Sequence, residues 1–470
     1  MKPYIFLFYF LLLQVLSAEA GYYQKTFGTP GADAGRSVKQ LNDGSIYVLG
    51  YSDSANVGKN EMALSKLKAD GNLMWTKLYK DSLSTVALHL TLDYDQNLIA
   101  CGQVTLDIDN EDAFVCKLDT AGEIIWFKKY GGTKYQSFKY IEACADRGFI
   151  ACGYTSDLSS SNDFYCVKLD SMGNVEWWGN YGGSSNDYAM MIHQTADGGF
   201  IVSGDTNSDG AGSYDVEVIR LSSTGSVIWD RLFGDSLSNG CQGLLALQDG
   251  SFASYGETES SVTGAFDFFI QKMDANGTEL YRNTFGGIKA DAIFSLLEAA
   301  NGDFVFTGYS NSYSSGPLNL VIGKTDSLAN LRWIRNYGDS GVDIGYEIIA
   351  EKDSGYLIFG TAATDFFLLY VSDSGAVVGI TEPTAESFLA TGFPNPSNGK
   401  LAISIPDAWN EKGLLQVISS SGVCVWEELI QPTFTKTIEV NFSDQVKPGI
   451  YQVRIMSKNK SYTSRICVTE

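Results

Sequence analysis

Short apolar runs separated by turns occupy most of this chain, and the stretch between residues 137 and 181 shows the pattern clearly. An alternating run (137–144) is followed by an almost wholly apolar run (149–154), and two further runs follow at 164–169 and 175–181. Alternation is typical of a strand with one buried face, and a wholly apolar run is typical of a strand buried on both faces. No helical period is present. The pattern therefore predicts four short antiparallel strands joined by turns.

This unit recurs along the chain at a nearly fixed interval. Its marker is an aromatic residue followed four positions later by a second aromatic residue, and then usually by glycine. The first aromatic residue recurs at steps of 52, 51, 51, 52, 52 and 52, at Tyr23, Trp75, Trp126, Trp177, Trp229, Tyr281 and Trp333. A marker glycine that closes the apolar run keeps the same step, at Gly50, Gly102, Gly153, Gly204, Gly256, Gly308 and Gly360. Self-similarity at this period indicates a stack of identical supersecondary units.

The way in which such units bury their surfaces predicts the fold. A four-stranded sheet with two apolar faces buries both only when it is stacked between others, and closing the stack into a ring removes the exposed ends. The seventh unit lacks its fourth strand, because Gly379 stands where the aromatic residue belongs. The missing strand is present at 22–28, where no other strand precedes it. We expect an all-β fold: a seven-bladed β-propeller (21–380) closed by its N-terminal strand, followed by a small β-sandwich.

The repeats resemble the glycine- and aspartate-rich propeller repeats of secreted bacterial proteins. The best match is residues 181–234, and the resemblance covers roughly residues 22–380. The repeats are similar, more weakly, to the tryptophan-docked repeats of quinoprotein propellers. The resemblance implies an architecture and leaves the activity open. The repeated aromatic residues are interpreted as packing between blades, and a stacking platform for sugars is the alternative.

The N-terminal residues are typical of a secretory signal peptide, predicted to span residues 1–20. Lys2 supplies the positive end, residues 4–16 form an apolar stretch, and Ala18 and Ala20 supply the small residues of a cleavage site. The apolar stretch is shorter than the ~20 residues of a membrane span. We therefore expect an exported protein without a transmembrane segment.

The C-terminal residues carry a second set of motifs after a predicted linker (381–391). A Pro-Asn-Pro opening, a central hairpin containing Gly422, and a late Gly-Ile-Tyr strand follow one another in residues 392–470. This order resembles the type A C-terminal sorting domain of the type IX secretion system. The resemblance implies a seven-stranded β-sandwich, recognition by the type IX machinery, and passage through the periplasm to the medium or the outer cell surface. Its motif residues are Pro394, Asn395, Pro396, Gly399, Gly449 and Tyr451. The alternative is an ordinary appended sandwich that binds carbohydrate or stabilises the propeller.

Charge and cysteine content narrow the partners and the covalent chemistry. The formal net charge of −22 argues against nucleic acid and anionic membranes, which require clustered Lys and Arg. Six of the eight cysteines occupy strand positions expected to be buried, where they act as small apolar residues. Cys424 and Cys467 are both in the last domain, and a disulfide between them is left open.

Catalytic motifs are not evident in the sequence. The only histidines, His89 and His193, fall in the first strands of the second and fourth units at non-equivalent positions, and are interpreted as packed or channel-facing. Repeated carboxylates are interpreted as turn or bridging acceptors, because a catalytic acid is needed once and not in every unit. They stand before the first strands, at Asp33, Asp187, Asp291 and Asp343, and near the starts of the third strands, at Asp112, Asp163, Asp215, Asp267 and Asp365.

One face of the propeller is expected to carry all the long connections, because the loops between second and third strands lie on the same face as the loops between units. The predicted long loops span residues 52–60, 106–112, 156–162, 206–214, 257–266 and 310–317. Variable loops on a rigid scaffold are where binding usually resides. The ligand-face candidates are Asp107, Asp109, Asp205, Asn207, Asp209 and Tyr313. Two acidic segments (107–112 and 205–210) have spacings that suit Ca²⁺, with an ordinary polar hairpin as the alternative.

The leading hypothesis is a secreted or cell-surface propeller that binds a glycan or a protein through its long-loop face, without a cofactor other than calcium. A glycan-active hydrolase or lyase with carboxylates at the channel mouth is the alternative, and a purely structural surface protein is the third.

Overall fold

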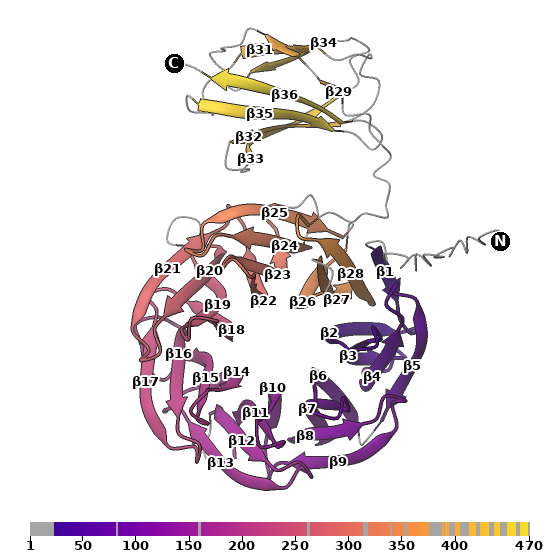
Figure 1. Ribbon diagram of the computed structural model, residues 1–470, viewed down its shortest axis with the longest axis vertical. Helices are drawn as coiled ribbons and strands as arrows, with labels where there is room; N and C mark the ends of the chain where they lie inside the picture. The colour runs from indigo at the N-terminus through magenta and orange to yellow at the C-terminus, as the bar shows by residue number, and fades with distance from the viewer. Residues whose placement is uncertain are drawn as a thin grey trace, which may run out of the picture.

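The computed structural model (Figure 1) describes residues 23–80, 83–157, 161–260, 264–313, 318–338, 341–351 and 355–375, and the strand segments after residue 375 named below. The expected signal peptide, with Ala18 and Ala20, lies outside the described residues. Seven four-stranded sheets form a ring (Figure 1), as the sequence predicts. We number them blades 1 to 7 from the sheet that begins with β2.

Each blade is antiparallel and is ordered from the centre of the ring outward. The inner strands are β2 (Ala32–Gln40), β6 (Ser84–Leu92), β10 (Gln136–Ala143), β14 (Asp187–Gln194), β18 (Asn239–Ala246), β22 (Asp291–Glu298) and β26 (Asp343–Ala350). The second strands are β3 (Ile46–Asp53), β7 (Leu98–Asp107), β11 (Phe149–Thr155), β15 (Phe200–Thr206), β19 (Phe252–Glu259), β23 (Phe304–Ser310) and β27 (Gly355–Ala362). The third strands are β4 (Glu61–Leu67), β8 (Asn110–Leu118), β12 (Asp163–Leu169), β16 (Asp215–Leu221), β20 (Phe266–Met273), β24 (Asn319–Thr325) and β28 (Asp365–Ser372). The outer strands are β5 (Leu73–Tyr79), β9 (Ile124–Tyr130), β13 (Val175–Tyr181), β17 (Val227–Phe233), β21 (Glu279–Phe285), β25 (Leu331–Tyr337) and β1 (Tyr23–Phe27).

The N-terminal strand closes the ring, as predicted. β1 pairs antiparallel with β28, from Tyr23 opposite Tyr370 to Phe27 opposite Phe366. The rings of each of these two pairs lie 5.7 Å apart. The first strand of the chain therefore becomes the outer strand of the last blade, and the non-covalent closure covers the edge of β28.

The hydrophobic core is divided among the seven junctions between neighbouring blades, each of which holds one cluster of buried residues in the described part of the chain. A second strand contributes to two clusters, because successive side chains point to opposite faces. In β3, Tyr47 and Leu49 pack toward blade 2, whereas Ile46 and Val48 pack toward blade 7. This double burial is the reason that the second run of each repeat is apolar throughout.

The outer aromatic residue of a blade packs on a turn of the next blade, so the interpretation of these residues as interblade packing is confirmed. Trp177 lies against Gly225, a turn glycine with φ of 81°, and the indole nitrogen donates to the carbonyl of Ser223 at 3.0 Å. The second aromatic residue of the motif, Tyr181, donates its hydroxyl to the Gly225 carbonyl at 2.6 Å. The same glycine contact recurs for Tyr23 with Gly71, Trp75 with Gly122, Trp126 with Gly173, Trp229 with Gly277 and Trp333 with Gly375.

The two faces of the ring carry different connections. One face carries the tight turns between first and second strands and between third and outer strands. The opposite face, here called the long-loop face, carries the connections between second and third strands and between blades. The loop predicted at 106–112 is instead mostly strand, because β7 and β8 extend until only Ile108 and Asp109 separate them. Glu111 supports the extension across the hairpin by accepting from Gln103 and Thr105 at 2.8 and 3.0 Å.

The C-terminal part forms two sheets. One has five strands in the order β29 (Phe388–Leu389), β36 (Ser461–Val468), β35 (Gly449–Met456), β32 (Gly413–Ser419) and β33 (Cys424–Ile430). The other has three strands in the order β30 (Thr391–Phe393), β31 (Lys400–Ser404) and β34 (Thr437–Asn441). Two sheets agree with the predicted sandwich, but eight described strands replace the expected seven. The additional strand is β29, which lies in the predicted linker and pairs parallel with β36.

The six cysteines of the propeller are buried and unbridged, as predicted: Cys101, Cys116, Cys144, Cys152, Cys166 and Cys241. The side chains of Cys424 and Cys467 lie outside the described part of the structure, so the disulfide between them stays an open prediction. The described residues contain no helix that is long and apolar enough to cross a membrane.

The packing of Trp177 on Gly225 predicts a difference between two glycine substitutions. Both Gly225 and Gly250 have φ of 81°, so Ala at either position has the same left-handed backbone cost. A Cβ at Gly225 would lie 2.8 Å from the Trp177 ring, whereas a Cβ at Gly250 meets nothing within 4 Å. We expect Gly225→Ala to lower the free energy of unfolding by about 1–3 kcal/mol more than Gly250→Ala, measured by urea denaturation. An equal loss of unfolding free energy in both variants would mean that the stability of the propeller does not depend on this contact.

Candidate functional site in the central channel

A β-bulge in the inner strand of every blade shapes the wall of the central channel. The pairing of each inner strand with its second strand shifts by one residue at the same place. A bulge re-aims the side chain at the extra residue. The residues at this bulge position are Arg36, Leu88, Lys139, Met190, Gln242, Phe294 and Tyr346, and all seven line one cavity of about 380 Å³.

The residue after the bulge joins its blade to the next one. An inner strand is the edge of its sheet on the channel side. Its N–H groups that point away from the second strand have no strand to pair with. Ser37 accepts from the Leu90 amide at 3.1 Å, and Ser295 accepts from the Ile348 amide at 3.3 Å. His89 and Glu347 hold the same position in their blades and accept the corresponding amides of Ile141 at 3.4 Å and Val38 at 2.5 Å.

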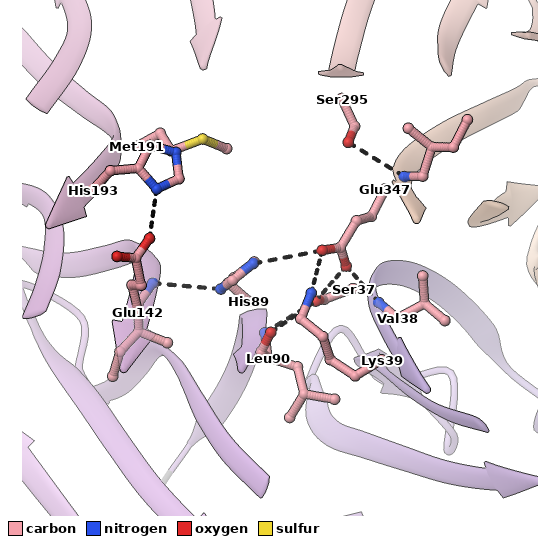
Figure 2. Close-up of polar contacts among 12 residues, drawn as sticks. Ser37, Val38, Lys39, His89, Leu90, Glu142, Met191, His193, Ser295 and Glu347 are labelled. Atoms are coloured by element: carbon pink, nitrogen blue, oxygen red, sulfur yellow. Dashed lines mark hydrogen bonds and ion pairs between the residues drawn. The ribbon is translucent and has the colours of Figure 1, made fainter. Parts of the chain in front are cut away.

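Glu347 is the centre of one polar cluster in the channel (Figure 2). Its Oε2 also accepts from the Ser37 hydroxyl at 2.6 Å, and its Oε1 forms an ion pair with Lys39. The His89 Nε2 lies 3.7 Å from the same Oε1. Burial would raise the Glu347 pKa, but Lys39 and His89 outweigh it and lower the pKa to about 2. Glu347 is therefore an ionised carboxylate that already has a cationic partner.

The pKa values of the two histidines are shifted in opposite directions. Burial lowers the pKa of His89, and its Nδ1 accepts a backbone proton, so the ring is neutral with its proton on Nε2. His193 lies between two acceptors, with Nδ1 2.5 Å from Glu142 Oε2 and Nε2 2.7 Å from the Leu244 carbonyl. Burial would lower the His193 pKa, but the Glu142 carboxylate outweighs it and raises the pKa. Both histidines line the channel, as one of the sequence interpretations states, and the structure shows in addition that each joins its blade to neighbouring blades.

Two cations on the channel wall are not paired with a carboxylate. Arg36 lies over the Tyr346 ring at 4.1 Å and donates from Nη2 to the Tyr51 hydroxyl at 2.9 Å. Lys139 lies over the Tyr154 ring at 5.5 Å. Within the described part of the chain, neither side chain forms an ion pair. This wall therefore has excess positive charge, although the whole protein is strongly acidic.

The predicted ligand-face residues lie in three separate blades. Asp107 and Asp109 are exposed at the tip of the blade 2 hairpin, where the Asp109 amide donates to Asp107 at 3.0 Å. Asn207 and Asp209 are exposed in the blade 4 loop, whereas Asp205 lies in β15 and accepts from the Cys241 amide of blade 5. Tyr313 packs on the core of blades 5 and 6 and donates its hydroxyl to the Gly286 carbonyl at 2.9 Å.

The remaining sequence candidates are placed as follows. Asp187, one of the repeated carboxylates, accepts from Thr206 at 2.5 Å and from Ser208 at 2.7 Å, as a turn acceptor does. Among the described residues, no three Asp, Glu, His or Cys side chains come together in a way that could hold a metal ion. Calcium stays a prediction. Gly449 and Tyr451 lie in β35, and the opening sorting motif (394–399) lies outside the described residues.

The sequence interpretation missed the bulge-position residues, although the repeat contains a signal for them. Each stands 14 residues before the marker glycine of its unit, as 50 − 36 = 14 shows for Arg36 and Gly50. Aligning the seven units on that glycine would have collected Arg36 and Lys139 in one column. The residues in this column share no chemical type, because they are not selected for packing in the core. Only the closed propeller shows that all seven line one cavity.

The burial of Asp205 predicts a pH-dependent stability. Burial raises its pKa to about 8, against about 3.9 in the unfolded chain. The folded state therefore holds a proton that the unfolded state loses, and stability falls as the pH rises from about 4 to 8. Asp205→Asn keeps an acceptor for the Cys241 amide and removes this titration. Both proteins are compared by urea denaturation at pH 5 and pH 8. The loss of unfolding free energy over this range should be smaller for the variant than for the unaltered chain, by at least about 1 kcal/mol. The exposed Asp209→Asn is the control, and identical pH slopes for all three proteins would contradict the assignment.

Comparison with known proteins identifies the C-terminal part. Residues 391–469 match the family described as the secretion system C-terminal sorting domain. No curated protein matches the chain. A sorting domain of this family implies export and a secreted or cell-surface location.

Three solved structures show a distant resemblance to the chain. PorZ, a surface component of the type IX secretion system of Porphyromonas gingivalis, is 11% identical, with 91% of this chain and 68% of PorZ covered and a TM-score of 0.34. Sqt1 of Chaetomium thermophilum is 12% identical, with 73% and 82% covered and a TM-score of 0.43. The Pan2 WD40 domain of Neurospora crassa is 9% identical, with 75% and 95% covered and a TM-score of 0.47. A likeness at this level carries no functional information. From its own repeats, its seven blades and the family match, the protein is a β-propeller repeat protein with a type IX secretion system sorting domain in its C-terminal part.

Proposed function

We propose that this protein is a secreted or surface-bound binding module, and that its propeller binds a glycan or a protein through the long-loop face. The sorting domain accounts for export and recognition by the secretion machinery. The propeller provides a rigid scaffold, because each blade is held by its neighbours at the core, at the rim and along the channel.

The difference between the two faces is the observation that carries the proposal. On the tight-turn face, aspartate-based turns recur with the same hydrogen bonds: Asp119 and Asp170 each accept two backbone amides of their own turn. These turns leave little variation from blade to blade. The connections of the long-loop face differ from blade to blade in length and composition, which is the arrangement that scaffolded binding sites use.

Exposed apolar side chains lie along blades 1 to 3 of the long-loop face. Ile108, at the tip of the blade 2 hairpin, is 89% exposed, and Val57 in the blade 1 loop is 63% exposed. Leu83 and Tyr135, in the connections that lead into blades 2 and 3, are also exposed. Apolar groups at loop tips contribute nothing to the core. They are suited to contact with a partner.

A hydrolase or lyase is the second candidate, and one observation favours it. Burial raises the pKa of Asp205 to about 8 and that of Glu257 to about 7, and each residue directly follows the marker glycine of its unit. Carboxyl groups that stay protonated near neutral pH can act as general acids. Each also has a structural contact, since Asp205 accepts from the Cys241 backbone amide, and Glu257 accepts from the Gln242 side-chain Nε2 at 3.3 Å. Asp205→Asn and Glu257→Gln should abolish turnover and retain binding if the protein is an enzyme.

The role of the sorting domain predicts the cellular location of a chain that lacks it. Removing residues 391–470 in the native host should leave a folded propeller in the periplasm, because the export signal is lost while the ring remains complete. Cell fractionation with an antibody to the propeller measures the distribution, and the full chain is the control. Normal export of the truncated chain, with residue 470 detected by mass spectrometry on the surface protein, would overturn the role of this domain.

The binding role is tested with the full chain on an array of glycans and purified surface proteins, with product formation followed in parallel. For the partner found, the double variant Val57→Ser, Ile108→Ser should weaken binding at least about tenfold, since it removes exposed apolar contacts. Met172→Ser is the matched control, because Met172 is 62% exposed in a tight turn of the opposite face. Loss of binding in the control alone would place the partner on the other face and contradict the proposal.

A further inference from the structure

We propose that the channel wall at Arg36 and Lys139 binds the anionic group of an acidic sugar, a carboxylate or a sulfate, with the sugar ring against the neighbouring aromatic side chains. This inference rests on the proposed binding function and specifies the ligand class of one site. Nothing in the repeat or sorting motifs assigns such a site.

The charges of the channel do not balance without a ligand. The Glu347 carboxylate is occupied by Lys39, and the Glu142 carboxylate is occupied by His193. His89 is neutral, as its lowered pKa indicates. Arg36 and Lys139 remain on the wall without a carboxylate partner among the described residues. Since a half-buried charge without a counterion is costly, the arrangement favours an anionic ligand.

The two unpaired cations influence each other. Burial lowers the pKa of Lys139, and the positive charge of Arg36 lowers it further. The negative charge of Glu111 opposes this effect, but both of its carboxylate oxygens accept hydrogen bonds, from Gln103 and Thr105. An anion between Arg36 and Lys139 would offset the repulsion between their two positive charges.

Arg36 is held in position before any ligand arrives. Its guanidinium lies over Tyr346 and also 5.4 Å from the centre of the Tyr51 ring, whose hydroxyl accepts from Nη2. Its Nε is buried and has no hydrogen-bond partner in the structure. A guanidinium with fixed orientation suits a planar or tetrahedral oxyanion, because its parallel N–H groups can donate two hydrogen bonds at once.

The surrounding side chains favour a sugar as the body that carries the anion. Phe294 lies 5.2 Å from Tyr346 and 5.8 Å from Tyr309, so aromatic rings continue from the Arg36 position along the wall. The Gln242 amide faces the same cavity, whose volume of about 380 Å³ is within the range of small-molecule sites. Aromatic faces suit the apolar face of a sugar ring, and the amide suits its hydroxyl groups.

The experiment compares three trisaccharides by calorimetry with the full chain: trigalacturonic acid, sulfated galactotriose and neutral galactotriose. At least one acidic probe should bind at least tenfold more tightly than neutral galactotriose. The difference in affinity between the carboxylated and the sulfated probe identifies the anionic group. Arg36→Gln and Lys139→Gln should each weaken that binding at least tenfold, and the double variant should abolish it. Lys128→Gln, a half-buried cation on an outer strand that donates to Asn174, should leave it unchanged.

A measurement on the unaltered chain tests the inference even if the variants do not fold. Affinity for the acidic probe should fall several-fold when the salt concentration is raised from 0.1 to 0.5 M, because the contact is ionic. Equal affinity for neutral galactotriose, no binding of either acidic probe, or unchanged binding by a folded double variant would each overturn the inference. Loss of a partner in the Val57→Ser, Ile108→Ser protein bears only on the proposed function, so the two can fail separately.

Discussion

The contact between an outer aromatic residue and a turn glycine of the next blade is the constraint on which the ring depends. The glycine has a positive φ and no side chain, and the ring of the preceding blade occupies the space that a Cβ would need. In six junctions this residue is glycine, and in the remaining one Ala329 takes the same left-handed conformation beneath Tyr281. Because each blade presents both the aromatic residue and the turn, every unit depends on a neighbour on each side. Only a closed ring satisfies all seven.

The channel is built by a different means. Its wall consists of seven sheet edges, and their free amides are satisfied in several blades by a side chain of the preceding blade. Several polar side chains of the channel are therefore engaged in contacts between blades. Glu347 and His89 resemble members of a catalytic cluster, yet each accepts an amide from the adjacent blade, and the low pKa of Glu347 reflects an ion pair in its own cluster. Arg36 and Lys139 have no carboxylate partner among the described residues, so they are the cations left for a ligand.

The division of labour between the two faces follows from the same architecture. The tight-turn face supplies the glycines on which the aromatic residues pack, and its turns are therefore constrained in length and conformation. The long-loop face does not contribute to this contact, so its loops can differ in every blade without disturbing the ring. Variation for binding and uniformity for stability therefore reside on opposite faces of one scaffold.

The sequence by itself determined the number of blades, the four strands of each, the closure by the N-terminal strand and the identity of the sorting domain. These features depend on local alternation and on a period that repeats, and both can be counted along the chain. It also predicted that His89 and His193 would be packed or channel-facing. The tight hairpin at Ile108 and Asp109 was not predicted, because the bonds from Gln103 and Thr105 to Glu111 that extend it connect two strands. The position of Arg36 and Lys139 on the wall of one cavity was decided only by the tertiary structure. These residues lie two blades apart, in a column of unlike residue types, and only the arrangement of the blades around the channel brings their two charges to one wall.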